Sequence, residues 1–279
     1  MNGHRTELRR GMARIGRLML AAAAVLLLVP PAGGAEAASP KLIALVIDDF
    51  GNNMKGTRQM LDLPVHLTVA VMPFLPSTKT DAETAYRMGH DVIVHLPMEP
   101  MRGKRSWLGP GAITTDLSDG EIRQRVEAAI ADVPHAVGMN NHMGSKATAD
   151  ERVMRVVLQV CKEHGLFFLD SRTSWHTVVP KVAREVGVKL LQNDVFLDDV
   201  STPRHISRQL MVLKKHLENH ELCVAIGHVG TSGPVTSEVL RSAIPELSSR
   251  AMFVRLSELV LPSAPAKAPQ SRAQGSNTR

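Results

Sequence analysis

The stretch KLIALVIDDFG at residues 41–51 decides the fold, because an uninterrupted apolar run leads directly into Asp48 and Asp49. A continuous apolar run of this length is typical of a strand buried on both faces, as in a parallel sheet covered by helices. Two carboxylates are costly to bury without partners. The end of this strand is therefore the first place to look for a site.

The rest of the chain alternates short apolar runs with amphipathic helical patterns, which predicts a largely parallel sheet covered by helices. Strands are expected at 41–47, 66–71, 91–95 (stopped by Pro97), 136–140, 166–169, 188–191 and 222–226, with a short last one at 252–254. Helices are expected at 78–88, 118–131, 150–164, 178–185 and 203–219, with one more before the last strand. Seven strands with intervening helices favour an α/β fold of the barrel type.

The first residues have the pattern of a targeting leader. Five arginines precede an uncharged apolar stretch at 18–29, and Ala35-Glu36-Ala37 supplies the small-x-small pattern that signal peptidase recognises. Twelve residues of helix span about 18 Å, which is short of a bilayer core of about 30 Å. We therefore expect residues 1–37 to be a signal peptide cleaved near Ala37, and the mature protein to be exported, periplasmic and without a permanent membrane span.

The basic net charge comes from the two ends of the chain. Residues 1–38 carry five Arg against two Glu, and residues 262–279 carry three cations and no acid; together they account for the whole formal charge of +6. Residues 262–279 hold no large apolar side chain, so we expect a disordered tail after one domain at 38–261. A neutral domain with a single Tyr and no interleaving of basic and aromatic residues predicts no nucleic-acid partner.

The two cysteines are in different settings. Cys161 lies in a helical pattern and Cys223 opens an apolar strand. An exported protein could pair them, but these settings favour two separate buried thiols.

Polar residues gather immediately after the predicted strands. The strand ends carry Asp48-Asp49, His95, Asn140-Asn141-His142, Asp170 and His228. Because the carboxyl ends of parallel strands meet at one rim, these side chains are expected to lie together there. Imidazole and carboxylate without thiolate form a ligand set suited to a divalent ion such as Zn²⁺.

Each of these residues alone has a plainer interpretation. An Asp pair after a strand can cap the following loop, and a single His such as His95 is more often a satisfied structural residue than a ligand. His142, however, lies in a polar segment that is hard to explain as core, and His228 lies beside glycines that allow close backbone approach. Their joint occurrence at one rim favours the functional interpretation.

Six segments in a fixed order resemble the divergent polysaccharide deacetylase family. They are residues 47–51 (IDDFG), 95–100 (HLPMEP), 138–145 (GMNNHMGS), 168–173 (FLDSRT), 195–199 (VFLDD) and 225–228 (AIGH). The resemblance covers residues 41 to about 260. It implies a distorted (β/α) barrel related to the NodB-type carbohydrate esterases, which remove N-acetyl groups from amino sugars by metal-assisted hydrolysis.

The resemblance also implies a role for each site residue. In these relatives the first Asp of the pair is the general base, the second binds metal with two His, and a later His is the general acid. By position, Asp48 would be the base, Asp49 and His95 metal ligands, and His228 the residue that protonates the leaving amine. This division suits amide hydrolysis, which needs an activated water, a stabilised oxyanion and a proton for the leaving nitrogen.

The chain departs from the family pattern after the third strand. Ordinary members carry a second metal-binding His four residues after the first, and Glu99 occupies that position here. We expect His142 to supply the missing imidazole, with Glu99 as the alternative. The usual Arg-x-Pro motif is absent, and Arg172 is a candidate substitute. The residues expected to contact substrate are Asn141, Asp170, Arg172 and Glu99.

These expectations converge on a metal-dependent hydrolase, with Zn²⁺ as the expected ion, that deacetylates a cell-envelope polysaccharide such as peptidoglycan or an exopolysaccharide. Loss of part of the metal-binding pattern supports an alternative, a catalytically weak or inactive glycan-binding or envelope-assembly protein that uses the same site. The sequence has no G-x-G-x-x-G after the first strand, no P-loop and no G-x-S-x-G, which argues against nucleotide cofactors and a serine nucleophile. Adjacent Asp48 and Asp49 also cannot readily flank a glycosidic bond, as a retaining glycosidase requires.

Overall fold

The computed structural model describes residues 40–260, whose nine strands form one sheet. The strands are β1 (Leu42–Phe50), β2 (Thr68–Val71), β3 (Asp91–Met98), β4 (Ala136–Met143), β5 (Phe167–Asp170), β6 (Leu190–Gln192), β7 (Val195–Phe196), β8 (Leu222–His228) and β9 (Met252–Phe253). They are ordered β6-β5-β4-β3-β2-β1-β8-β7, with β9 paired to β1. Every pairing between these strands is parallel, as the alternating pattern predicts.

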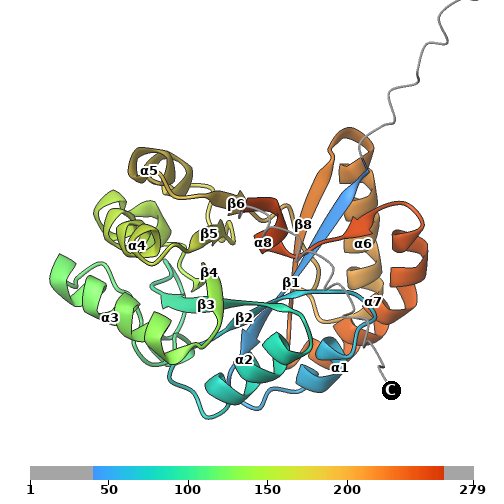
Figure 1. The fold of residues 1–279 in the computed structure, drawn as a ribbon, viewed down its shortest axis with the longest axis horizontal. Helices are drawn as coiled ribbons and strands as arrows, with labels where there is room; N and C mark the ends of the chain where they lie inside the picture. Colours follow the sequence, from blue (N-terminus) through green and yellow to red (C-terminus); the bar gives the residue numbers. More distant parts are fainter. Residues whose placement is uncertain (1–39, 261–279) are drawn as a thin grey trace, which may run out of the picture. The chain divides into compact units, whose positions relative to one another are not determined.

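Helices connect the strands and cover the outer face of the sheet (Figure 1). The α-helices are α1 (Thr57–Leu61), α2 (Thr78–Arg87), α3 (Asp119–Asp132), α4 (Glu151–Glu163), α5 (Val179–Val186), α6 (Pro203–Asn219), α7 (Gly233–Ser248) and α8 (Leu256–Val260), and the 3-10 turns are η1 (Arg105–Trp107) and η2 (Ala147–Ala149). Ser118 and Glu121 form a capping box at the start of α3. It satisfies backbone N–H groups that a helix start otherwise leaves without partners.

The sheet curls into an incompletely closed barrel. Its edge strands β6 and β7 are separated by only Asn193 and Asp194 in the chain, yet they do not pair with each other. Figure 1 shows the short helix α8 in the region between β6 and β8. Leu256 of α8 is fully buried in the apolar cluster of the concave face. The distorted (β/α) barrel expected from the sequence is therefore confirmed, with eight strands along its curved path.

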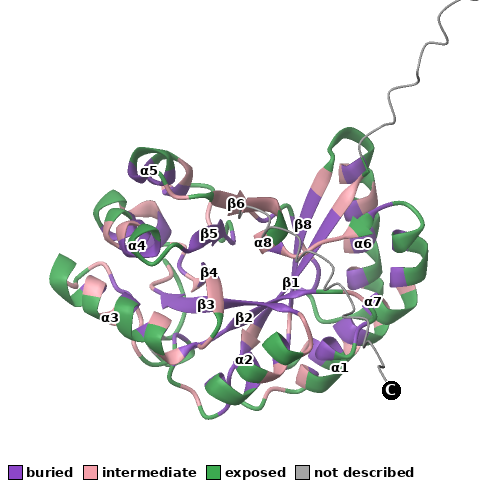
Figure 2. Ribbon diagram, in the orientation of Figure 1, coloured by how far each residue is buried: buried purple, intermediate pink, exposed green. Residues whose placement is uncertain are grey.

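Both faces of the sheet are buried, as the apolar run of β1 predicts. Successive residues of β1 alternate between two clusters, so that Ile43, Leu45 and Ile47 pack under the helices and Ala44 and Val46 pack on the concave side. Figure 2 shows buried residues along β1, β3 and β8 and on the sheet-facing sides of the helices. The concave cluster combines small side chains such as Ala44 and Ala70 with larger ones such as Phe167, so the interior of the barrel is filled by side chains.

Two strand predictions needed correction. Pro97 does not end the third strand, because β3 continues to Met98. The pairing of β2 with β3 ends at Val94, and β3 beyond that point pairs with β4. The missing N–H of Pro97 is therefore tolerated where the strand no longer has β2 as a neighbour. The sequence interpretation also missed β7, whose two residues are too short to show a period.

Cys161 and Cys223 are both free and buried, which confirms the prediction of two separate thiols. Burial raises the pKa of each thiol to about 12. The predicted signal peptide at 1–37 and the predicted tail at 262–279 lie outside the described residues. Among residues 40–260, none of the helices combines the length and apolar character that a membrane crossing needs.

Packing on the concave face makes Gly138 of β4 sensitive to substitution. A methyl group there would lie 2.5 Å from the ring of Phe167, which is 1% exposed. We expect Gly138→Ala to lower the free energy of unfolding by about 1–3 kcal/mol, as overpacking commonly does. Gly120 in the first turn of α3 has nothing within 4 Å of an added methyl group, so Gly120→Ala is the matched control. Chemical denaturation of both variants tests this; equal effects would contradict the packing argument.

Candidate active site

Alternation along the strands places the candidate site on the concave face. On β1, β3 and β8 each site residue follows a concave core residue by two positions, and side chains two apart on a strand share a face. These pairs are Val46–Asp48, Ile93–His95 and Ile226–His228. On β4, Met139 packs in the convex core, so Asn140 and His142 face the concave side. The carboxyl ends of four strands thus direct polar side chains to one place.

A β-bulge brings Asp49 to the same place. Simple alternation would direct Asp49 away from Asp48, to the opposite face. Instead, both aspartates oppose the single residue Ala70 of β2, because the register shifts between the pairs Ile47–Val69 and Phe50–Val71. Asp49 also has a left-handed φ of 71°, which is uncommon for a residue other than glycine. Bulges of this kind re-aim a side chain, and they are frequent next to active sites.

Three side chains converge on one point at the mouth of the barrel. Asp49 Oδ1 lies 3.2 Å from His95 Nε2 and 3.0 Å from His142 Nδ1. The two ring nitrogens lie 3.1 Å from each other. Asp48 Oδ2 lies 3.7 Å from His95 Nε2, at the side of this triangle. The structure therefore brings together the three residues that the sequence suggested as metal ligands.

The hydrogen bonds behind the two rings fix their tautomers. His95 Nδ1 lies 2.7 Å from Asn140 Oδ1, an acceptor, since the Nδ2 of Asn140 donates to Asp48 Oδ1 at 2.9 Å. His142 Nε2 lies 3.2 Å from the carbonyl oxygen of Trp107, which can only accept. Each ring therefore donates its proton outward. In the neutral rings His95 Nε2 and His142 Nδ1 then carry lone pairs, and both face Asp49.

Three electron-pair donors that face one another repel unless a positive charge lies between them. Asp49 Oδ1 is buried and has no hydrogen-bond partner of acceptable geometry among the described residues. The ligand atoms of a tetrahedral zinc ion with bonds of about 2.0 Å are separated by about 3.3 Å. The observed separations of 3.0–3.2 Å come close to this value. The donor set therefore fits a divalent ion with imidazole and carboxylate ligands.

The electrostatics of the cluster favour positive charge at the same point. Burial lowers the pKa of His95, but Asp48 and Asp49 outweigh it, so that the pKa of His95 is raised. Burial raises the pKa of Asp49, but the contacts with His142 and His95 hold it well below its usual range. The pKa of Asp48 is raised, chiefly by burial. Asp49 is thus kept ionised, as a metal ligand must be.

His228 faces the cluster from β8, where it is paired in register with Asp48. Its Nδ1 lies 2.7 Å from Asp198 Oδ1, and Asp198 Oδ2 accepts hydrogen bonds from the His228 N–H and from Thr236 Oγ1. Burial lowers the pKa of His228, but the hydrogen bond with Asp198 and the charges of Asp48 and Asp49 raise it to about 9. At neutral pH this imidazole is protonated, so Nε2 carries a proton that it can donate.

The residues expected to contact substrate are not gathered in the same way. Asn141 and Asp170 are 1% and 0% exposed. The amide of Asn141 binds the backbone of Met143, and Asp170 accepts hydrogen bonds from the Arg172 N–H and from Thr177. Both side chains organise the loops beside the site.

Glu99 and Arg172 also lie apart from the three converging ligand atoms. Glu99 accepts hydrogen bonds from Thr115 and pairs with Lys146 at 2.8 Å. The structure therefore places His142, and not Glu99, beside His95. Arg172 is exposed and lies over the ring of Trp175.

Sequence interpretation assigned no role to Asn140 and Asp198, which hold His95 and His228 in place. Both belong to segments that carried the family resemblance, 138–145 and 195–199. Asp198 closely follows the short apolar run of β7, which is the same signal that singled out Asp48 after β1. Recognising β7 as a strand would have revealed it.

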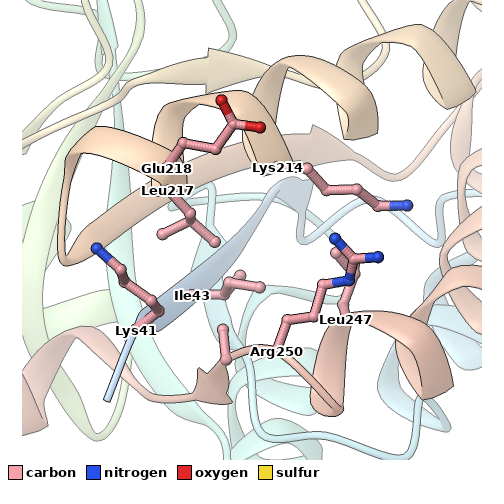
Figure 3. A pocket seen from close by; sticks show the side chains of 8 residues that line it. Lys41, Ile43, Lys214, Leu217, Glu218, Leu247 and Arg250 are labelled. Carbon is pink, nitrogen blue, oxygen red and sulfur yellow. The ribbon is translucent and has the colours of Figure 1, made fainter. Parts of the chain in front are cut away.

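Two other places in the described residues are weaker candidates. Asp194, His216 and Cys223 lie near one another, but His216 Nε2 is 3.8 Å from an Asp194 oxygen that already accepts the Val224 N–H. Burial and Asp194 raise the pKa of Cys223 to about 12, so the thiol stays protonated. The pocket of Figure 3 lies at the opposite end of β1 from Asp48, where basic and apolar side chains line it and Glu218 is its one carboxylate. Neither place offers a donor set as compact as that of Asp49, His95 and His142.

Comparison with known proteins agrees with this architecture. Residues 45–260 match the family described as divergent polysaccharide deacetylase. An uncharacterized protein of Haemophilus influenzae Rd is 34% identical over 217 residues, which are 78% of this chain and 76% of that protein. The uncharacterized protein YibQ of Escherichia coli K12 is 35% identical over 218 residues, which are 78% of this chain and 67% of that protein.

A solved structure extends the comparison to the fold. An uncharacterized protein of Agrobacterium tumefaciens C58 superposes with a TM-score of 0.74 at 21% identity, over 80% of this chain and 91% of that chain. At this identity the likeness shows the fold alone. The family match covers both the barrel and the strand ends that carry Asp48, Asp49 and His228, and the chain belongs to the divergent polysaccharide deacetylase family.

Proposed function

We propose that this chain is a hydrolase, dependent on a divalent metal ion, that removes N-acetyl groups from a polysaccharide of the cell envelope. The convergence of Asp49, His95 and His142 on one point carries the proposal. Zn²⁺ suits two imidazoles and one carboxylate. Peptidoglycan and N-acetylated exopolysaccharides are the envelope polymers whose acetylated amino sugars fit this chemistry.

The residues around the ligand group would supply the base and the acid that amide hydrolysis also needs. A divalent ion held there would supply Lewis-acid chemistry, polarising the acetyl carbonyl and acidifying the attacking water. Asp48 Oδ1 is held by Asn140, so its other oxygen, on the side of His95, accepts the proton of that water. Burial raises the pKa of Asp48, which makes it a stronger base than an exposed carboxylate.

His228 supplies the proton that the leaving amine needs. Asp198 accepts from Nδ1 and so orients the ring, leaving Nε2 as the donor toward substrate. A pKa of about 9 keeps this imidazole protonated at neutral pH. Asp48 and His228 are thus a base and an acid on neighbouring strands, as amide hydrolysis requires.

Asp198→Asn is expected to shift the alkaline limb of the pH profile. The acid must be protonated, so kcat/KM falls as pH rises through the pKa of His228, which is about 9 in the native protein. Without the carboxylate that stabilises the imidazolium, the pKa of His228 falls and activity is lost at lower pH. Asp199→Asn is the matched control, because Asp199 is exposed and pairs with His205 instead. An unchanged limb in Asp198→Asn would contradict the role of His228 as the acid.

Acetate release tests the function itself. The protein is stripped with chelator, reloaded with Zn²⁺, Co²⁺ or Mn²⁺, and incubated with N-acetylated peptidoglycan and with chitooligosaccharides. We expect release only after reloading. Glycan binding without acetate release under all three ions would reject the hydrolase and leave the alternative, a glycan-binding protein that uses the same site.

A further inference from the structure

The two tryptophans of the chain are both exposed beside the candidate active site. Trp107 is 58% exposed and Trp175 is 91% exposed. Trp107 lies in the connection from β3 to α3, and Trp175 in the connection from β5 to α5. Since β4 lies between β3 and β5, the two loops leave the sheet on either side of the strand that carries His142 (Figure 1).

Hydrogen bonds tie both loops to the end of β4. The carbonyl oxygen of Trp107 accepts from His142 Nε2 at 3.2 Å. Thr173 Oγ1, two residues before Trp175, donates to the carbonyl oxygen of Met143 at 2.8 Å. The backbones that carry the tryptophans are therefore positioned by the same strand as the candidate metal ligand.

Each tryptophan has a cation beside it. Lys104 Nζ lies 5.9 Å from the ring centroid of Trp107, and Arg172 Cζ lies 5.7 Å from that of Trp175. Arg102 is exposed on the same loop as Lys104. These cations and the two indoles together combine apolar ring faces with positive charge on the two loops that flank the end of β4.

Arg172 is held in a strained conformation. Its φ is 54°, in the left-handed region that few residues other than glycine adopt, and its N–H donates to Asp170 Oδ1 at 2.8 Å. Strain of this kind is retained where the surroundings enforce it, commonly at ligand-binding positions. The hydrogen bond to the buried carboxylate of Asp170 thus holds the backbone of Arg172 in the position from which its side chain extends.

We propose that Trp107 and Trp175, with Arg102, Lys104 and Arg172, form a rim that binds an acidic glycan chain, one whose sugars or substituents carry carboxylates. The electron-rich faces of the indoles attract the C–H groups of sugar rings, and the cations pair with the carboxylates. The inference rests on the proposed function and narrows its substrate to an N-acetylated polymer with negative charge. A neutral glycan would contact the indoles only, and the cations would stay solvated by water.

Intrinsic fluorescence tests the rim directly, because Trp107 and Trp175 are the two tryptophans of the chain. The purified full chain, kept in chelator so that no acetyl group is lost, is titrated with a hyaluronan hexasaccharide and with chitohexaose. Both probes contain N-acetylglucosamine, but only the first carries carboxylates. We expect the acidic probe to bind about tenfold more tightly at low salt and to lose this advantage at high salt. The single-tryptophan variants Trp107→Phe and Trp175→Phe should each show a change in the remaining indole.

Variants separate the two parts of the rim. Trp175→Ala is expected to weaken both probes by about tenfold, as loss of an aromatic anchor does. The triple variant Arg102→Gln, Lys104→Gln and Arg172→Gln should lower affinity for the acidic probe to that for chitohexaose. Tyr86→Ala, an exposed aromatic on α2, is the control and should change neither affinity.

The outcomes distinguish this inference from the proposed function. Equal affinity for the two probes, or full affinity in Trp175→Ala, overturns the rim even if the protein releases acetate. A rim that behaves as expected in a protein that releases no acetate with any ion supports the inference and rejects the hydrolase.

Discussion

Asp49→Ala is expected to abolish binding of a divalent ion and to lower turnover at least about a thousandfold. Asp49 supplies the carboxylate of the ligand group, and it lies within 3.2 Å of both imidazoles. Without it, two neutral nitrogens remain to hold the ion, and Asp48 is separated from His95 by 3.7 Å. Calorimetric titration with Zn²⁺ measures the loss of binding, and acetate release measures the loss of turnover.

The matched variant is Glu99→Ala, because Glu99 stands where ordinary family members carry their second histidine. Glu99 accepts a hydrogen bond from Thr115 and pairs with Lys146. Removal of the Glu99 side chain is therefore expected to leave ion binding unchanged. Asp49→Asn serves as a second test, since Asn tolerates the left-handed φ of 71° better than Ala does. An ion that stays bound in Asp49→Ala and is lost in Glu99→Ala would overturn the ligand assignment.

Most of the barrel could be predicted because the sequence of β1 reflects its surroundings. An apolar run with no polar interruption is typical of a strand buried on both faces, and such strands are characteristic of parallel sheets covered by helices. Carboxyl ends of parallel strands share a rim, so the placement of His95, His142 and His228 followed from the strand ends alone. The choice of His142 over Glu99 also agrees with the structure, which brings His142 within 3.1 Å of His95.

The direction of individual side chains was harder to predict. In a regular strand, neighbouring side chains point to opposite faces, so Asp48 and Asp49 would be expected on different faces. The bulge opposite Ala70 instead directs both toward the site. The hydrophobic period of the sequence does not reveal such a bulge. The same period of two explains why the side chain of Asn141 does not face the site. Asn141 lies between Asn140 and His142 on β4, and those two side chains face inward. Polar residues at the ends of strands therefore indicate where the site lies in the barrel. The local strand register decides which of their side chains face it.

The two aspartates have separate environments although they are neighbours in the chain. Asp49 contacts two imidazoles, and its pKa lies well below the usual range. Asp48 is 2% exposed beside Asn140, and burial raises its pKa. Carboxylates whose pKa values are pushed apart in this way can act as ligand and base at the same pH. A variant that removes only the basicity of Asp48 should then separate the two roles.

Asp48→Asn is expected to keep the ion and to lower kcat by about 100- to 10,000-fold, the usual contribution of a general base. The amide has the shape of the carboxylate, and its oxygen can still accept from Asn140, but it cannot take a proton from water. Because burial raises the pKa of Asp48, the ionised form costs folding free energy above that pKa, so the neutral amide should leave the protein at least as stable at neutral pH. Zn²⁺ titration, acetate release and thermal unfolding in chelator measure the three quantities. Loss of the ion together with turnover would make Asp48 a ligand, and full turnover would show that another group accepts the proton.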